Sequence, residues 1–403
     1  MEKYESIKRI LNKYLYLVAI FFLFWAAVAG VLMRFTQIYG LSGFVFDKWL
    51  HGHSHVAFLG WGFLAALYLL TKKIHYQHRK IDFILYMIMI MSILGMLITF
   101  PIFGYKLIPI LFLVAFLLAS YYLLYRYLKF LKPTTEFWLK WVKSGIWFYY
   151  ISSLAIWVIP VVMVKFDKGV IYFNLVYFYL HFLYNGFFSF VLWGLIFNYL
   201  KENYKIDENR KFSFFYNLLL ISVIPTYVLS LYWNPPHLVV QIIGITSSFL
   251  QILGVLIFIS EWWKRRKQIF KYWFFNLIFT IFIFKIFMQF LSSFYSLSAG
   301  AIALKPYFVV GYLHWFTLGF MSLSLFWLSD TFKNFISKIG LFLFVFGFIL
   351  TELTLFYNGA IFLFQWKIPT LPFLGLLHCS ILMLLGIIII AIDQIRMLNR
   401  NQV

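Results

Sequence analysis

The fold is decided by the stretch from His51 to Leu70, which reads His-Gly-His-Ser-His-Val-Ala-Phe-Leu-Gly-Trp-Gly-Phe-Leu-Ala-Ala-Leu-Tyr-Leu-Leu. It places three histidines at the start of an apolar run that is long enough to cross a membrane as a helix. An imidazole buried in hydrocarbon without a partner costs several kcal/mol, on the order of other unsatisfied polar groups. Each of these histidines therefore needs a hydrogen bond, a metal or a cofactor.

Part of this stretch occurs three times in the chain. The pattern His-x4-Gly-aromatic begins at His55, at His181 and at His314, with intervals of 126 and 133 residues. Each interval has room for four membrane spans, so the three histidines would occupy equivalent places in successive units. We expect a single transmembrane domain over residues 1–403, built from three pseudo-repeated four-helix arcs, approximately 1–140, 141–268 and 269–403.

The composition predicts an all-α integral membrane protein. Of 403 residues, 64% are hydrophobic, 24% aromatic and only 12% charged, and no polar segment is long enough for a soluble domain. The single cysteine, Cys379, excludes an intramolecular disulfide, and the missing C-x-x-C-H motif excludes covalent heme attachment within this chain. The Lys and Arg residues behind the net charge of +21 are distributed between the spans in a way that indicates membrane topology. This distribution argues against nucleic acid as a partner.

Windows of about 20 apolar residues predict twelve spans. They lie near residues 14–34, 52–71, 82–101, 106–125, 143–164, 172–200, 213–233, 238–260, 270–293, 307–329, 335–357 and 371–393. With the N-terminus inside, 26 of the 34 Lys and Arg residues fall in cytoplasmic segments. This asymmetry predicts a multi-pass protein of the cytoplasmic (inner) membrane, in contact with lipid and with both termini cytoplasmic.

The same orientation places seven of the nine histidines in or beside the outer half of the bilayer. They are His51, His53, His55, His181, His237, His314 and His378. Among them, His55 and His314 occupy equivalent positions near the start of different spans. Two axial ligands of one heme must also come from different helices. Gly60 and Gly319 follow these two histidines and would let a macrocycle or a neighbouring helix approach closely. The three matches could also arise by chance in a sequence rich in Gly and Phe.

This arrangement resembles the catalytic subunit I of heme-copper oxidases. The segment His-Ser-His-Val-Ala-Phe-Leu-Gly-Trp is similar to the span-two segment of C-type cytochrome c oxidases, and equally to that of the NnrS family of heme proteins. The resemblance implies a low-spin b-type heme between His55 and His314. It also implies a role in respiratory electron transfer or nitric oxide handling, with a quinol or cytochrome as electron donor and with partner subunits.

The chain departs from that resemblance at the second metal site. Tyr312 stands where the oxidases carry the first histidine of a span-ten His-x-His, and the seventh predicted span has no histidine pair. We expect Tyr312 to act as an interhelical hydrogen-bond donor, and ligation of a second heme by its phenolate is the alternative. His181 is the remaining histidine of the copper set. Copper would need further ligands from His53, His237 or His378, and hydrogen-bonded structural roles are the alternative for these residues. His53 should point away from His55, since residues i and i+2 of a helix lie about 200° apart.

Three charged residues within or beside the spans need partners. Lys285 and Glu352 would pair with each other, or Lys285 with a heme propionate, because a lone ion in a span is costly. Glu352 could instead carry protons. Arg34 is a candidate propionate anchor, and an interfacial snorkelling arginine is the alternative.

Three functions stay open from the sequence. The first is the heme protein, whose status as an enzyme is undecided. The second is a terminal oxidase or nitric oxide reductase subunit with a non-standard second metal site. The third is a twelve-span transporter without heme.

Overall fold

The computed structural model describes residues 2–166, 169–329 and 335–400. Lys168 and Lys333, which contribute to the charge asymmetry, lie outside these ranges. The described residues are helical throughout, with short connections and no strand. An all-helical membrane protein is therefore confirmed, because a helix satisfies its own backbone hydrogen bonds in lipid.

Eleven helices are long and apolar enough to cross a membrane. A twelfth span results if α9 (Arg210–Val223) and the 3₁₀ segment η3 (Pro225–Leu231), which are bent by 46° at the break between them, are counted as one. The bend falls at Pro225, which lacks an N–H for the helical ladder and clashes with the preceding turn. The twelve predicted spans thus match eleven continuous helices and one broken helix.

Packing divides the chain into two compact units, each of which we describe by itself. Unit 1 comprises Met1–Pro133, Leu325–Thr354 and Thr370–Val403, and unit 2 comprises Thr134–Ser324 and Leu355–Pro369. Two of the four boundaries fall inside helices, α14 (Leu323–Leu328) and α15 (Phe335–Phe364), and the other two fall in connections. The division into three arcs is not tested by these units and stays a prediction.

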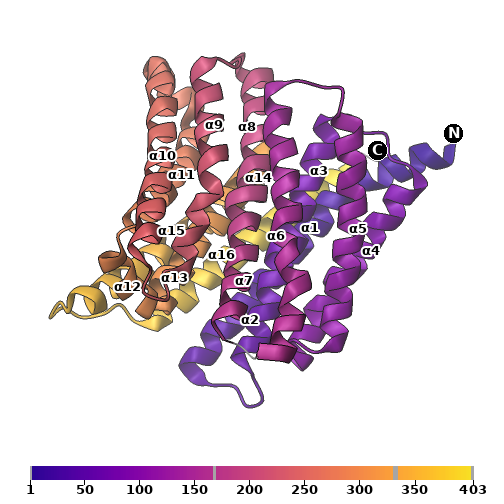
Figure 1. Ribbon diagram of the computed structural model, residues 1–403. Helices are drawn as coiled ribbons and strands as arrows, with labels where there is room; N and C mark the ends of the chain where they lie inside the picture. Colours follow the sequence, from indigo (N-terminus) through magenta and orange to yellow (C-terminus); the bar gives the residue numbers. More distant parts are fainter. Residues whose placement is uncertain (1, 167–168, 330–334, 401–403) are drawn as a thin grey trace. The chain divides into compact units, whose positions relative to one another are not determined.

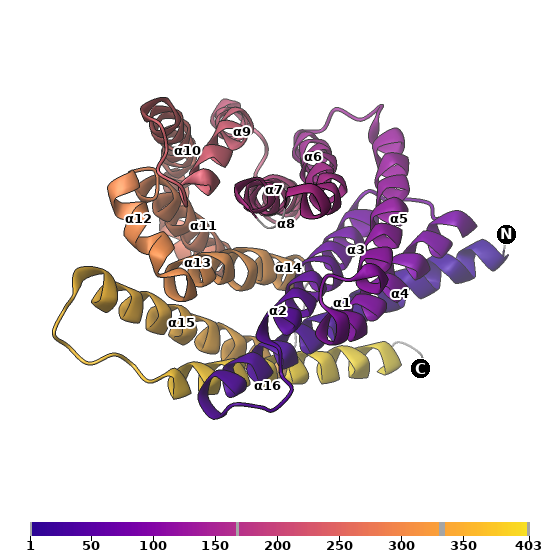
Figure 2. The same cartoon turned by 60° about the horizontal axis from the view of Figure 1, so that its bottom comes forward.

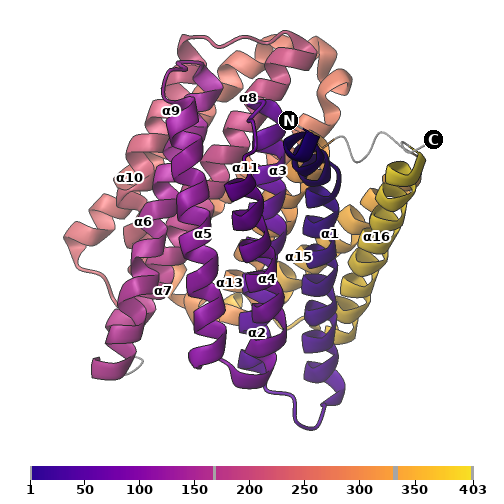
Figure 3. The ribbon, with the colours of Figure 1, turned by 90° about the vertical axis from the view of Figure 1, so that its right-hand side faces the viewer.

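Unit 1 holds the first four spans and much of the last two. Its elements include α1 (Glu2–Tyr39), α2 (Phe46–His55), the π-helix η1 (Val56–Phe63), α3 (Leu64–Lys73), α4 (Lys80–Phe103), α5 (Leu107–Leu131) and α16 (Phe373–Arg400). Helices α4 and α5 lie side by side, and α1 packs on α16 (Figures 1 and 3). Helices α15 and α16 approach closely through small residues, since a Cβ on Gly340 would lie 2.7 Å from the carbonyl oxygen of Gly386.

A buried charge in unit 1 is fully paired. Asp82, at the start of α4, accepts from Arg126 Nε at 2.6 Å and from the backbone N–H of Arg79 at 2.6 Å. The Asp82 side chain is completely buried, so these bonds replace the water it has lost. The nearby loop residue Tyr76 is buried as well, and burial together with the Asp82 charge raises the pKa of its hydroxyl.

Unit 2 holds spans five to nine and most of span ten. Its elements are α6 (Phe137–Phe166), α7 (Val170–His181), the π-helix η2 (Phe182–Phe188), α8 (Ser189–Tyr204), α9, η3, α10 (Leu238–Trp262), η4 (Trp263–Tyr272), α11 (Trp273–Leu291), α12 (Tyr295–Ala303), α13 (Lys305–His314) and the π-helix η5 (Trp315–Ser322). Helices α7 and α8 form one long span against α6, and α9 packs on α10 (Figure 2).

Spans two, six and ten differ from the others in burial. Their most apolar windows are 83%, 94% and 56% buried, whereas those of the other eight continuous spans are 39–50% buried. These are also the spans that carry the repeated histidine pattern. Their low exposure leaves little of their surface for lipid, so their polar side chains must find partners within the protein.

Candidate functional site

The three repeated histidines share one local conformation. His55, His181 and His314 are each the last residue of an α-helix and are each followed at once by a π-helix. Helices of this kind are rare and are frequent at functional sites, because the wider turn changes the direction in which side chains project. No other π-helix occurs in the part of the chain that the structure describes. The repeat in the sequence is therefore also a repeat in the backbone.

The repeat extends to the helix that packs against each π segment. A Cβ on Gly60 would lie 2.6 Å from Phe22 Cβ of α1, and a Cβ on Gly186 would lie 2.6 Å from Phe148 Cβ of α6. Both phenylalanines and both glycines are separated by the same interval of 126 residues as His55 and His181. Of the two roles expected for Gly60, the approach of a neighbouring helix is the one observed. Gly319 is buried in η5.

A serine bond closes two of the three π segments. Ser189 Oγ donates to the carbonyl oxygen of Tyr184 at 2.8 Å, and Ser322 Oγ donates to that of Thr317 at 2.6 Å. Both serines stand eight residues after the repeated histidine, and Phe63 holds that place in span two. The bonds satisfy carbonyls of the wider turn without help from a neighbouring helix.

His55 lies in an aromatic setting within unit 1. Its ring stacks on Phe100 with centroids 4.7 Å apart, and its Nε2 is hydrogen-bonded to the hydroxyl of Tyr105 at 3.0 Å. Tyr105 belongs to the short connection between α4 and α5. When the ring proton is on Nδ1, the tyrosine donates and Nε2 presents a lone pair, which is also the form that ligates a metal.

His53 has a different partner. Its Nδ1–H donates to the backbone carbonyl of Ala26 in α1 at 2.8 Å. Gly30 lies beside this contact, and a Cβ there would be 3.5 Å from the His53 ring, an ordinary van der Waals distance. The bond joins α2 to α1, on a different side of α2 from His55. One ring nitrogen of His53 is therefore occupied by a backbone carbonyl.

Both ring nitrogens of His181 are used by unit 2. Its Nε2–H donates to the carbonyl of Val223 at 2.8 Å, and its Nδ1 accepts from the amide of Asn185 at 3.1 Å. The Val223 carbonyl is available because the next turn is broken at Pro225: Tyr227 N–H donates to Ile224 instead. His181 is thus the second donor to this carbonyl, beside Thr226 Oγ1 at 3.1 Å, and in this arrangement its ring has no lone pair left for copper.

His314 ends α13, directly before η5, and is half-buried. Two residues earlier, Tyr312 donates its hydroxyl to Gln289 Oε1 of α11 at 3.3 Å. The expectation that Tyr312 acts as an interhelical hydrogen-bond donor is confirmed. His55 belongs to unit 1 and His314 to unit 2, so ligation of one heme by both stays a prediction.

The expected second metal site is not assembled by the described residues. His237 is exposed at the N-terminus of α10, and His378 is exposed on α16. No group of three His, Cys, Asp or Glu side chains within residues 2–166, 169–329 and 335–400 comes together in a way that could hold a metal ion. Copper has no support from this geometry.

The intramembrane charges are placed in separate surroundings. Glu352 of α15 is completely buried, and Arg34 of α1, in the same unit, acts on it electrostatically. Lys285 of α11 is 2% exposed and donates to Gln289 Oε1 at 2.9 Å within unit 2. The expected pairing of Lys285 with Glu352 joins different units and stays a prediction, as does the role of Arg34 at a propionate.

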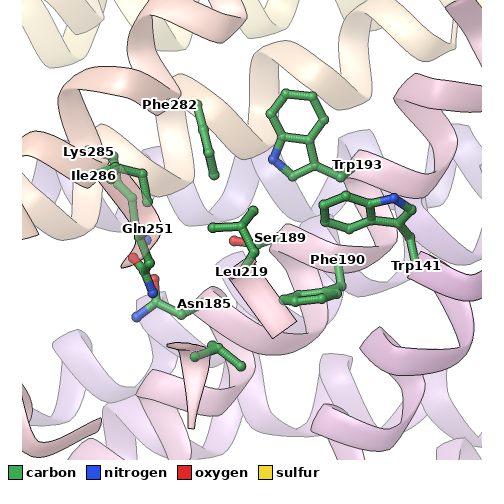
Figure 4. A pocket seen from close by; sticks show the side chains of 11 residues that line it. Trp141, Asn185, Ser189, Phe190, Trp193, Leu219, Gln251, Phe282, Lys285 and Ile286 are labelled. Atoms are coloured by element: carbon green, nitrogen blue, oxygen red, sulfur yellow. The ribbon is translucent and has the colours of Figure 1, made fainter. Parts of the chain in front are cut away.

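Lys285 faces a small pocket inside unit 2 (Figure 4). The pocket is lined by Trp141, Asn185, Ser189, Phe190, Trp193, Leu219, Val223, Gln251, Phe282, Lys285 and Ile286. The space open to the centre of a water molecule is about 10 Å³. A carboxylate does not fit there, so a heme propionate beside Lys285 would need the side chains to rearrange.

Sequence reasoning missed several residues of these surroundings. Phe100 and Tyr105 contact His55, whereas Asn185, Gln251 and Gln289 form the polar lining near His181 and Lys285. Asn185 follows His181 by four residues, a spacing that puts both on one helix face and could have revealed it. Gln289 follows Lys285 by the same interval on α11, whereas Phe100, Tyr105 and Gln251 come from distant segments and carry no local signal.

The donor set itself suits a b-type heme. Neutral imidazoles from separate helices are standard axial ligands, and His55 is buried among aromatic rings with only an exchangeable hydroxyl on Nε2. The chemistry of His55 fits, and that of His181 does not. No family model matches the chain, and no curated protein is significantly similar to it.

Proposed function

We propose that this protein is a membrane-embedded b-type heme protein with His55 and His314 as axial ligands. The observation that carries the proposal is the junction of α- and π-helix at the histidine in three equivalent spans, together with the buried His55, whose Nε2 meets the exchangeable hydroxyl of Tyr105. A bound heme would supply one-electron redox chemistry. The function that follows is electron transfer or nitric oxide handling.

The residues of the chain would contribute ligation and insulation. His55 would present Nε2 once the hydroxyl of Tyr105 has turned away, and Phe100 would hold the imidazole plane by stacking. The lipid-shielded position of span two would exclude water from the site. Partner subunits and a quinol or cytochrome donor belong to the same proposal.

The oxidised and reduced visible spectra of the purified protein, with iron and copper quantitation, test this function. One heme per chain without stoichiometric copper, and no oxygen consumption with quinol or reduced cytochrome c, is the expected result. Stoichiometric copper with turnover on the enzymatic scale of roughly 1 to 10³ per second would instead indicate a terminal oxidase or nitric oxide reductase.

A transporter is the second candidate, and two observations favour it. Span seven is broken at Pro225, and Asn185, Ser189, Gln251 and the buried Lys285 bring polar groups into a mainly apolar pocket inside unit 2. Secondary transporters use broken helices and polar sites inside the membrane in this way. A purified chain that carries no heme absorbance would decide in favour of the transporter.

We also propose an inner-membrane topology with both termini cytoplasmic, on the strength of the charge asymmetry. Reporter fusions at residues 75, 135, 206 and 265 should be cytoplasmic, and those at 45, 168, 235 and 303 should be external. An external reporter at 265 would require a different number of spans.

A further inference from the structure

The pocket beside Lys285 contains a charge with an incomplete set of partners. An ammonium has three N–H groups, and the described bond to Gln289 uses one of them. The ring of Phe282, 5.9 Å from Nζ, adds a weak cation–π contact. Because Lys285 is 2% exposed, bulk water does not supply the remaining bonds.

No carboxylate of unit 2 compensates this charge at the pocket. The acidic residues that the structure describes in this unit are Glu136, Glu202, Asp207, Glu208 and Glu261, and none of them lines the pocket. Glu261 is already paired with Lys264 at 2.7 Å. A buried cation without an anion or a strong polar shell would cost several kcal/mol, on the order of a desolvated ion.

The same pocket contains two buried acceptors without a hydrogen bond. Asn185 Oδ1 and Gln251 Oε1 lack a donor, and the two residues are 5% and 3% exposed. Their amide nitrogens are engaged, by His181 for Asn185 and by Thr226 Oγ1 for Gln251. Figure 4 shows Lys285, Gln251 and Asn185 along one side of the pocket, with the indoles of Trp141 and Trp193 along the other.

We propose that the pocket binds one ordered water molecule, which accepts from Lys285 and donates to Asn185 and Gln251. The space of about 10 Å³ for its centre is that of a single water, and a buried water needs two to four polar partners, about as many as these side chains offer. A halide would be repelled by the two amide oxygens, and a ligand with several heavy atoms does not fit.

The water makes the polar side chains of unit 2 continuous. It joins the group Tyr312, Gln289 and Lys285 to the group Asn185, His181 and Val223 at the Pro225 bend. Within unit 2, Lys285 is thereby hydrogen-bonded by Gln289 and by the water. This site is independent of the heme proposal, since none of its direct contacts involves His55 or His314.

A double-mutant cycle between Lys285 and Gln251 tests the proposal, since no direct hydrogen bond joins these two described residues. Lys285→Met, Gln251→Leu and the double variant of the full chain are compared by their unfolding equilibrium constants in detergent. A shared water predicts a coupling of roughly tenfold, the scale of a hydrogen bond to a charged group. Additivity within roughly twofold overturns the shared water.

A matched cycle controls for the Leu substitution. Gln241 lies on the same helix α10 and donates to the carbonyl of Pro236, away from the pocket. The cycle of Lys285→Met with Gln241→Leu should be additive. Equal coupling in both cycles would mean that α10 responds as a whole, and it would overturn the assignment to the pocket.

A high-resolution density map gives the second readout, which does not depend on stability. One peak within hydrogen-bond distance of Lys285 Nζ, Asn185 Oδ1 and Gln251 Oε1, and its loss in Gln251→Leu, is expected. A peak that gains scattering when chloride is replaced by bromide would show an anion instead. A map with no peak there would likewise overturn the proposal.

Discussion

His55 and His181 occupy the same backbone position in two units and have opposite surroundings. Each ends an α-helix, precedes a π segment and stands five residues before a glycine that packs against a phenylalanine. The His55 ring meets one phenol from a short connection, whereas the His181 ring is held by a backbone carbonyl and an amide. Equivalent backbone positions therefore do not imply equivalent chemistry.

The difference arises from the neighbouring span. Pro225 breaks span seven and frees the Val223 carbonyl from its helical N–H partner. Thr226 Oγ1 donates to this carbonyl at 3.1 Å, and His181 supplies the second donor at 2.8 Å. In unit 1, α4 also contains a proline, Pro101, but the contact of His55 is with the Tyr105 hydroxyl just beyond that helix. The local repeat therefore gives both histidines the same backbone position, and the neighbouring segment determines which groups each ring contacts.

The largest expected difference between these histidines is in heme content. His55→Ala should abolish the low-spin heme signal, since an axial ligand is lost, and His314→Ala should do the same. His181→Ala should retain the signal in whatever protein folds. The reduced-minus-oxidised spectrum, normalised to folded protein, measures this. The exposed His75→Ala variant should behave as wild type, and retention of a bis-histidine spectrum in His314→Ala would remove His314 from the site.

For the stability of the heme-free chain, we expect the larger loss in the His181 variant and the smaller loss in the His55 variant. His181→Ala should lower the free energy of unfolding by about 3 kcal/mol, because it removes one of two bonds to the buried Val223 carbonyl, leaves the Asn185 amide without its acceptor and creates a cavity. His55→Ala should cost roughly 1–2 kcal/mol, since Tyr105 can find another acceptor. Thermal unfolding in detergent compares them. A greater loss for His55 would contradict the structural role assigned to His181.

The next effect tests whether the two π segments pack alike. Gly60→Ala and Gly186→Ala should each cost about 1–3 kcal/mol, because the added methyl would lie 2.6 Å from Phe22 Cβ or Phe148 Cβ. Gly375→Ala, where a Cβ meets nothing within 4 Å, is the matched control and should be nearly neutral. Clearly unequal losses at Gly60 and Gly186 would end the equivalence of the two segments.

The smallest effect concerns the serines that close two of the π segments. Ser189→Ala and Ser322→Ala should each lower stability by about 0.5–1.5 kcal/mol, the net worth of one hydrogen bond. Calorimetry or denaturant titration of both variants measures this. No loss in either would mean that the wider turn holds without the side chain, as it does in span two with Phe63.

The sequence alone determined that the chain lies in a membrane, where its spans fall and that the His-x4-Gly-aromatic pattern occurs three times. Apolar runs of about 20 residues between basic loops predict helices with little ambiguity, since lipid offers the backbone no other partner. The spacing of His55, Gly60 and the aromatic residue identified the three π segments without naming their conformation. It also predicted that Tyr312 would bond across helices, as Gln289 shows.

Only the tertiary structure decided what each polar side chain contacts. His181 and Lys285 each have one partner four residues away on the same span, Asn185 and Gln289, but the Val223 carbonyl reaches His181 from 42 residues away and leaves no periodic signal. Asn185 had the right spacing, but Gln251 reaches the same pocket from α10. Apolar periodicity encodes which face of a helix is buried, whereas hydrogen bonds require atoms to meet within about 3 Å, and only the packed chain fixes that.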